Sequence, residues 1–170
     1  MQAQYQKGEY VRYAANGVCL VEDIRQMPEL KRGDLFYVLR PIADQKSTYY
    51  IPIDNEKLTG KLRPVLTRDE VNALIDSVHD AEMIWIEDRK QRVEQFHAAL
   101  RACDLRQLMV TACTLYLQKQ SVLRAGKKLT PSDETVLRQA EALVDNEIAF
   151  VLDLPVSGVG TYIRNRLGME

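Results

Sequence analysis

The chain has 170 residues, 46% of them hydrophobic, which is enough apolar material for one packed domain or two small ones and excludes a disordered chain. Its formal net charge of −1 argues against bulk electrostatic attraction to nucleic acid. No segment approaches the roughly 18 apolar residues of a membrane span, and the first residues lack a leader-peptide pattern, so we expect a cytoplasmic protein.

The three cysteines, Cys19, Cys103 and Cys113, are odd in number and lack the paired spacing of a metal site. Their neighbours are apolar, so we expect reduced cysteines inside strands or helices of the core. The sequence shows no nucleophile beside a base, metal cluster, phosphate-binding loop or paired carboxylates at usable spacing. We therefore expect a protein that binds and is not an enzyme, with no cofactor and no metal.

Residues 1–64 carry strand and turn signals. The LFYVL stretch is apolar on both faces, as expected for a strand that is covered on each side in a tightly curved sheet. We predict a small bent antiparallel β-barrel of the SH3 or Tudor type. The predicted strands are Tyr10–Ala14, Val18–Arg25, Asp34–Pro41 and Thr48–Ile53, with an edge segment at Leu62–Val65 and turns at Asn16-Gly17 and Lys31-Arg32-Gly33.

Residues 65–170 carry only helix signals, so the expected class is α+β, a barrel followed by an all-helical bundle. Thr67 and Glu70 have capping-box spacing, and Thr130-Pro131 has the pattern of a helix start. The predicted helices run from the cap Thr67 to Val78, over Met83–Ala102, from the cap Asp104 to Arg124, over Pro131–Asp153, and from the cap Ser157 to near the end. The fourth has the widest apolar arc and should be central.

His97 lies on the second predicted helix. It falls in the apolar stripe formed with Ile86, Val93, Phe96 and Leu100, so we expect a histidine at the edge of the core and not a ligand.

Trp85 is the only tryptophan, and the pattern places it at the start of the same helix, about 80° from the centre of that stripe. We favour packing in the core, because an isolated aromatic residue near an apolar face usually packs. The alternative is an exposed ring that stacks on or wedges beside an unpaired base, while Arg89, Lys90 and Arg92 hold phosphates.

The segment between Asp104 and Asp133 contains no acidic residue. The simpler interpretation, which we favour, is a solvated helix face followed by a basic loop. The alternative is a contact with nucleic-acid phosphates. The basic residues of the segment are Arg106, Lys119, Arg124, Lys127 and Lys128.

The order and spacing of several segments resemble the CarD family of bacterial transcription regulators, which share their N-terminal module with the transcription-repair coupling factor. These segments are KGEYVRYAANGVCLVEDI, FYVLRP, YIPIDN with LRPV, Trp85 with Arg89 and Lys90, and LTPSDETVLRQAEALVDNEIAF. The resemblance implies that the barrel binds a lobe of the RNA polymerase β subunit. It also implies that the helical domain contacts promoter DNA just upstream of the melted region.

By the same resemblance, Trp85 would wedge into the minor groove at the upstream edge of the bubble and slow its collapse, without reading a sequence. We expect the free protein to be a monomer. The candidate DNA contacts are Trp85, Arg89, Lys90, Lys127 and Lys128, and the candidate polymerase contacts are Tyr49, Tyr50, Ile51 and Pro52.

Two positions depart from the family pattern. Tyr50 stands where some members have arginine, so docking here would use tyrosine packing in place of an ion pair. Glu87 and Asp88 stand where some members have basic residues, and like charge near phosphate would weaken a DNA contact. The alternative function is a protein-interaction adaptor that docks on polymerase without touching DNA.

Overall fold

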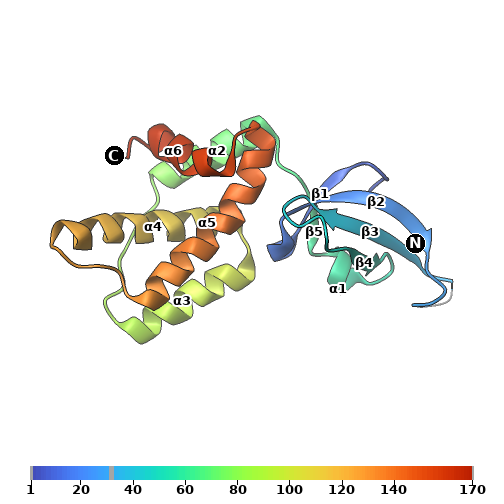
Figure 1. Cartoon of the computed structure of the whole chain (residues 1–170), viewed down its shortest axis with the longest axis horizontal. Helices are drawn as coiled ribbons and strands as arrows, with labels where there is room; N and C mark the ends of the chain where they lie inside the picture. Colours follow the sequence, from blue (N-terminus) through green and yellow to red (C-terminus); the bar gives the residue numbers. More distant parts are fainter. Residues whose placement is uncertain (1, 31–32, 170) are drawn as a thin grey trace. The chain divides into compact units, whose positions relative to one another are not determined.

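The computed structural model describes residues 2–30 and 33–169 (Figure 1). The chain divides into two compact units, Met1–Leu66 and Thr67–Glu170. The first unit contains an antiparallel sheet and the second contains helices, so the predicted α+β class is confirmed. The predicted turn at Lys31-Arg32-Gly33 falls on residues 31–32, which lie outside the described residues.

The first unit is built on a five-stranded antiparallel sheet with the order β4-β3-β2-β1-β5. Because β4 and β5 lie at its two edges, the sheet is not closed into the barrel that we predicted. Each edge strand ends in a proline, Pro52 or Pro64, which has no N–H to donate to a further ladder. The strands are β1 Tyr10–Tyr13, β2 Val18–Gln26, β3 Leu35–Pro41, β4 Tyr49–Pro52 and β5 Leu62–Pro64, with a 3-10 turn at Ala14–Asn16 and a short helix α1 at Glu56–Thr59.

Strand β3 is buried on both faces, as its sequence predicts. Tyr37 and Leu39 belong to the main apolar cluster of the sheet, while Phe36 and Val38, on the other face, are each only 4% exposed. The Tyr37 hydroxyl accepts hydrogen bonds from the backbone N–H groups of Gln4 (2.7 Å) and Tyr5 (3.2 Å). These bonds tie the first residues to the sheet.

The second unit is a bundle in which α5 packs against each of the other four helices, so the predicted central helix is confirmed (Figure 1). The capping box of Thr67 and Glu70 is present, and the Thr130 hydroxyl caps α5 by accepting the Asp133 N–H, with Pro131 as the first helical residue. The helices are α2 Arg68–His79, α3 Arg89–Ala102, α4 Leu105–Arg124, α5 Pro131–Leu152 and α6 Val156–Leu167.

Helix α3 begins at Arg89 and not at Met83, so the predicted start was wrong by six residues. The Asp88 carboxylate accepts a hydrogen bond from the Gln91 N–H (2.8 Å) and caps the helix. An aspartate satisfies the free first-turn amides well from the cap position, which explains why the helix starts after it. Residues 82–88 have no regular secondary structure, and we call them the 82–88 segment. Trp85 lies in this segment and not on a helix.

Two further expectations for the helices were wrong. His97 is exposed, because the buried side of α3 is set by Arg92, Phe96 and Ala99, and His97 points about 100° away from Phe96. Ser157 lies inside α6, whose N-cap is Pro155 and has no side-chain cap bond. Ile163 and Leu167 of that helix are buried, as expected for a helix docked on the bundle.

The cysteines are all free. Cys19 and Cys113 are buried, and burial raises the pKa of each thiol to about 11, so both are core thiols as expected. Cys103 differs from the expectation, because it ends α3 in a left-handed conformation (φ 52°) and is only partly buried.

Candidate functional site

Strand β4 offers an open backbone edge. It pairs with β3 on one side, with Val38 opposite Tyr50 and Tyr37 opposite Ile51, and no described strand pairs with its other side. An exposed edge can accept a strand from a partner through its backbone N–H and C=O groups, while alternate side chains supply selectivity.

The four predicted polymerase contacts on β4 are not equally accessible. Tyr50 is 41% exposed, whereas Ile51 is only 3% exposed and belongs to the core of the sheet. Tyr49 is partly buried and meets Tyr13 edge-on, with 5.8 Å between ring centres. Side chains alternate along a strand, so residues 49 and 51 face the core while Tyr50 faces out. Pro52 is partly buried at the end of the strand.

The Trp85 side chain is partly buried in the helical unit. Its ring packs against the apolar cluster of Phe96, Leu115, Val136 and Leu137, and lies 6.4 Å from the Phe96 ring. The preceding residue, Ile84, is 66% exposed. One side of the indole is therefore anchored, and the ring lies at the surface of the bundle and not deep within it.

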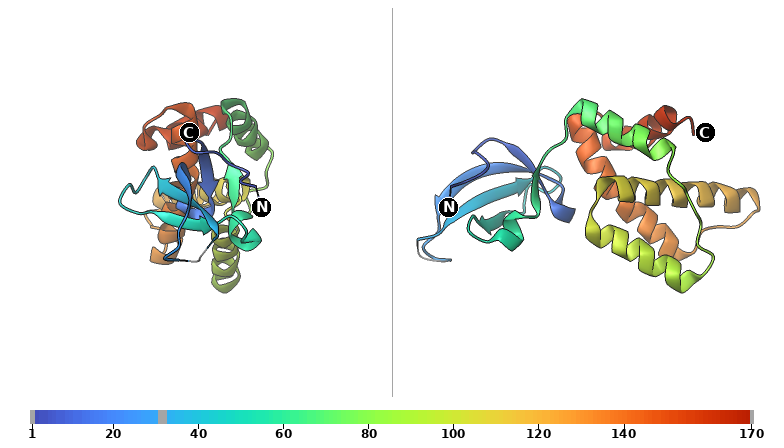
Figure 2. Two further views of the ribbon diagram at one scale, coloured as in Figure 1. Left: turned by 90° about the vertical axis from the view of Figure 1, so that its right-hand side faces the viewer. Right: turned by 180° about the vertical axis from the view of Figure 1, so that it is seen from behind.

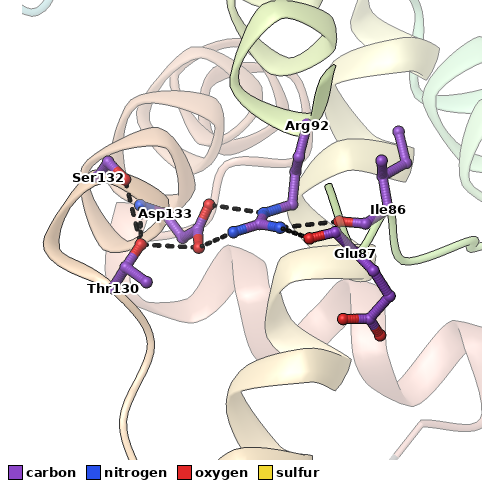
Figure 3. A network of polar contacts seen from close by, with 6 residues as sticks. All are labelled: Ile86, Glu87, Arg92, Thr130, Ser132 and Asp133. Atoms are coloured by element: carbon purple, nitrogen blue, oxygen red, sulfur yellow. Dashed lines mark hydrogen bonds and ion pairs between the residues drawn. The ribbon is translucent and has the colours of Figure 1, made fainter. Parts of the chain in front are cut away.

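Arg92 holds the 82–88 segment against the bundle (Figure 3). Its Nη1 donates to the backbone carbonyls of Ile86 (2.8 Å) and Glu87 (3.1 Å). Its Nε and Nη2 donate to the two carboxylate oxygens of Asp133 at 3.2 and 3.1 Å. The guanidinium carbon lies 4.4 Å from the centre of the Trp85 ring, in cation–π contact. Arg92 is only 5% exposed, so the phosphate-holding role that we considered for it was wrong.

Asp133 connects this contact to the start of α5. Its carboxylate accepts a hydrogen bond from the Thr130 hydroxyl (2.8 Å), and its own N–H donates to that hydroxyl (3.2 Å). The Ser132 hydroxyl also lies 3.1 Å from the Thr130 hydroxyl (Figure 3). We call Arg92, Asp133, Thr130 and the two carbonyls of residues 86 and 87 the Arg92–Asp133 network.

The four predicted basic DNA contacts are all exposed. Arg89 and Lys90 are the first two residues of α3, and Lys127 and Lys128 lie in the loop between α4 and α5. That loop begins at Gly126, whose left-handed conformation (φ 72°) ends α4.

The 82–88 segment and the α4–α5 loop lie at the same end of the helical unit, as the views in Figures 1 and 2 show. Leu129 in the loop and Trp85 pack against the same apolar cluster. The fold therefore brings Trp85, Arg89 and Lys90 together with the basic loop that contains Lys127 and Lys128.

This end of the bundle also carries negative charge. Glu82, Glu87 and Asp88 are exposed close to Trp85. Asp88 serves the fold as the cap of α3, so its carboxylate is directed toward the first-turn amides. The surface has mixed charge and is not a uniformly basic patch.

A small cavity between α4, α5 and α6, of about 50 Å³, contains charged groups that the sequence interpretation did not single out. Burial, together with the nearby Glu141 carboxylate, raises the pKa of Asp145 to about 7, against the opposing effect of Arg164. The Arg164 guanidinium lies 4.9 Å from the centre of the Tyr116 ring.

Within residues 2–30 and 33–169, no group of three or more His, Cys, Asp or Glu side chains is arranged to hold a metal ion. In the same part of the chain, no helix has the length and apolar character needed to cross a membrane.

Comparison with known protein families identifies the first unit. Residues 5–66 match the family model described as the CarD-like/TRCF RID domain. This region is therefore a CarD-like RNA polymerase interaction domain, which confirms the resemblance for the N-terminal segments of the sequence. The match gives the chain a transcription-related role that involves interaction with RNA polymerase. No curated protein matches the chain. The match ends before the helical unit, so it does not cover Trp85 or the basic residues near it.

Proposed function

We propose that this protein is a non-catalytic transcription regulator. It binds the RNA polymerase β subunit through the Met1–Leu66 unit and stabilises the open promoter complex through the helical unit. The observation that carries the proposal is the match of residues 5–66 to an RNA polymerase interaction domain. The DNA part rests on the surroundings of Trp85.

On the polymerase side, the open edge of β4 adds to a strand of the β subunit. Backbone hydrogen bonds supply most of the affinity, and Tyr50 supplies a side-chain contact, since it is the exposed residue in the middle of this strand. The pairing is short because Pro52 has no N–H to donate.

On the DNA side, the Trp85 ring enters the minor groove at the upstream edge of the melted region and supports a partly unstacked base step. Arg89, Lys90, Lys127 and Lys128 contact phosphates, which strengthens binding without reading a sequence. Stacking of a base on an aromatic side chain contributes about 1–3 kcal/mol, which corresponds to about a 5- to 150-fold change in how long the open complex lasts.

A second function is favoured by a specific observation, the partial burial of Trp85 beneath Arg92 beside the acidic residues Glu82, Glu87 and Asp88. In this alternative the protein is an adaptor that docks on polymerase without DNA contact, and Trp85 only packs the bundle.

Two assays on the full chain separate these functions, namely co-purification with RNA polymerase and the lifetime of open promoter complexes after a competitor is added. We expect Tyr50→Glu to reduce both. We expect Trp85→Ala to leave co-purification unchanged and to shorten the lifetime. A normal lifetime with Trp85→Ala supports the adaptor, and a parent chain that does not co-purify with polymerase contradicts both functions.

A further inference from the structure

We propose that Arg92 is a positioning residue for Trp85, and that it holds the indole in one orientation before the protein meets DNA. The inference rests on the proposed function, because it says how the wedge is prepared. The structural half of the inference, that Arg92 determines the place of the ring, is testable in the free protein.

The geometry of Arg92 suits this role. One edge of the guanidinium makes two bonds to the Asp133 carboxylate, and the remaining nitrogen donates to the carbonyls of Ile86 and Glu87. A planar fork with fixed donor directions is specific to arginine, since a lysine ammonium is a point charge on a flexible stem. The carbon of the same guanidinium lies over the Trp85 ring.

The location of the two bonded carbonyls explains why the ring depends on Arg92. They belong to the two residues that directly follow Trp85, in a segment with no helix or strand pairing of its own. A segment without a backbone ladder is ordered by its side-chain contacts. The bonds from Arg92 therefore restrict the backbone beside Trp85, while the guanidinium covers one side of its ring.

Burial makes the restraint rigid. The side chains of Arg92 and Asp133 are only 6% and 2% exposed, so solvent competes little for their hydrogen bonds. A side chain that is already ordered loses less conformational entropy when it binds. A wedge held in this way binds more tightly than the same ring on a loose loop.

The Asp133 carboxylate also accepts from Thr130, at the end of the loop that carries Lys127 and Lys128. The Asp133 carboxylate thus restrains both the 82–88 segment, which contains Trp85, and the α4–α5 loop, which contains the two lysines. The Arg92–Asp133 network therefore sets the spacing between Trp85 and this loop.

Trp85 is the only tryptophan, so its fluorescence reports on this site alone. We would compare Arg92→Lys, which keeps the charge, and Arg92→Met, which keeps much of the length, in the full chain. Both should shift Trp85 emission to longer wavelength, increase its quenching by acrylamide and lower its anisotropy, with helical content retained by circular dichroism. The matched control is Arg166→Lys, which alters a two-bond pair with Asp76 at 2.6 and 2.8 Å and should change none of these signals.

If Arg92→Met loses its helical content, Arg92→Lys and Asp133→Asn supply the test, because Asp133→Asn removes the ion pair and preserves the shape of the side chain. Emission and quenching equal to those of the parent in the folded variants would overturn the inference, because Arg92 would then have no part in placing the ring.

The functional arm measures open-complex lifetime. We expect Arg92→Lys to shorten the lifetime by about two- to tenfold in the parent and to add nothing in a Trp85→Ala background, since residues that act through one group are not additive. An equal loss in both backgrounds would mean a general structural role and would overturn the inference. If Trp85→Ala alone has a normal lifetime, the proposed wedge function fails, and the fluorescence result still decides whether Arg92 places the ring.

Discussion

The two candidate surfaces are held in place by different kinds of contact. In the first unit, Tyr50 lies on β4, whose backbone is paired with β3 from Phe36 to Leu39, and its outward direction follows from strand alternation. In the helical unit, Trp85 lies in a segment without regular structure, and its place depends on the side chains of Arg92 and Asp133. Many backbone hydrogen bonds between β3 and β4 hold Tyr50 in place, whereas the position of Trp85 depends on two side chains of the Arg92–Asp133 network. The second surface should therefore be far more sensitive to single substitutions.

The largest effect should come from breaking the buried pair. Asp133→Ala leaves the Arg92 charge buried without its partner, and we expect it to destabilise the helical unit by about 3–5 kcal/mol. Urea unfolding followed by circular dichroism and by Trp85 fluorescence measures the change. Arg166→Ala, which removes a pair at the surface, should have little effect. If Asp133→Ala lowered the free energy of unfolding as little as Arg166→Ala, the Arg92–Asp133 network would not be what holds this surface.

Trp85→Ala should have an intermediate effect on stability. A fully buried tryptophan costs about 3–5 kcal/mol when it is truncated, but this ring is only partly buried, so we expect about 1–2 kcal/mol. Urea unfolding followed by circular dichroism measures it. Ile84→Ala, one residue away and 66% exposed, is the control and should change stability by less than about 0.5 kcal/mol. If Trp85→Ala reduced stability as much as truncation of a fully buried tryptophan does, the result would favour the adaptor function, in which Trp85 only packs the bundle.

The same contrast explains what could be predicted from the sequence. The burial of β3 on both faces, the capping box at Thr67 and the start of α5 at Thr130-Pro131 each depend on residues within a few positions of one another, and all three were confirmed. Local patterns identify such features because the interacting groups are close in the chain.

The setting of Trp85 could not be predicted in this way. Arg92 and Asp133 are 41 residues apart, and neither looks unusual in its own helix. The predicted helix over Met83–Ala102 placed Asp88 inside the helix, whereas Asp88 is the cap of α3. The unclosed sheet was missed for a related reason, because pairing between the two edge strands, β4 and β5, depends on long-range geometry that no local pattern records.

The Asp145 carboxylate should make the free energy of unfolding of the helical unit depend on pH. The expected change is about 1 kcal/mol, after allowance for screening by solvent. Its folded pKa of about 7 lies above the ordinary 3.8, so the folded state keeps the proton after the unfolded state has lost it. Stability contributed by this group is therefore present at acid pH and falls as the pH rises from about 4 to about 7.

Urea midpoints at pH 5 and pH 8 test this prediction. Asp145→Asn should flatten the dependence and stabilise the protein at pH 8. Asp76→Asn is the control, because the hydrogen bond from Arg166 lowers the pKa of Asp76, so this carboxylate stays ionised between pH 5 and pH 8 and its replacement should leave the pH dependence unchanged. An unchanged slope in Asp145→Asn would show that this carboxylate does not titrate in the expected range.

Tyr50→Glu should leave stability within about 0.5 kcal/mol of the parent, because the β4 ladder is made by backbone groups and the side chain points outward. Its effect should appear in polymerase binding, measured by co-purification. Tyr10→Glu introduces the same charge at a tyrosine of similar exposure, 44% against 41%, and should co-purify normally. If Tyr50→Glu and Tyr10→Glu reduced co-purification equally, the added negative charge would explain the loss, and the edge of β4 would not.

The smallest effect on the fold should come from Lys127→Ala with Lys128→Ala. Both side chains are exposed in the α4–α5 loop, so thermal unfolding should not change. If each lysine contacts one phosphate, removing both should reduce the slope of log affinity against log salt by about 1.8, without changing sequence preference. The measurement is binding of the polymerase complex to promoter DNA at several salt concentrations, with Arg138→Ala on the exposed surface of α5 as the control.

If the double variant kept the parent's slope of log affinity against log salt, the α4–α5 loop would only connect two helices. A reduced slope together with normal Trp85 fluorescence would separate the electrostatic part of the surface from the part that Arg92 holds.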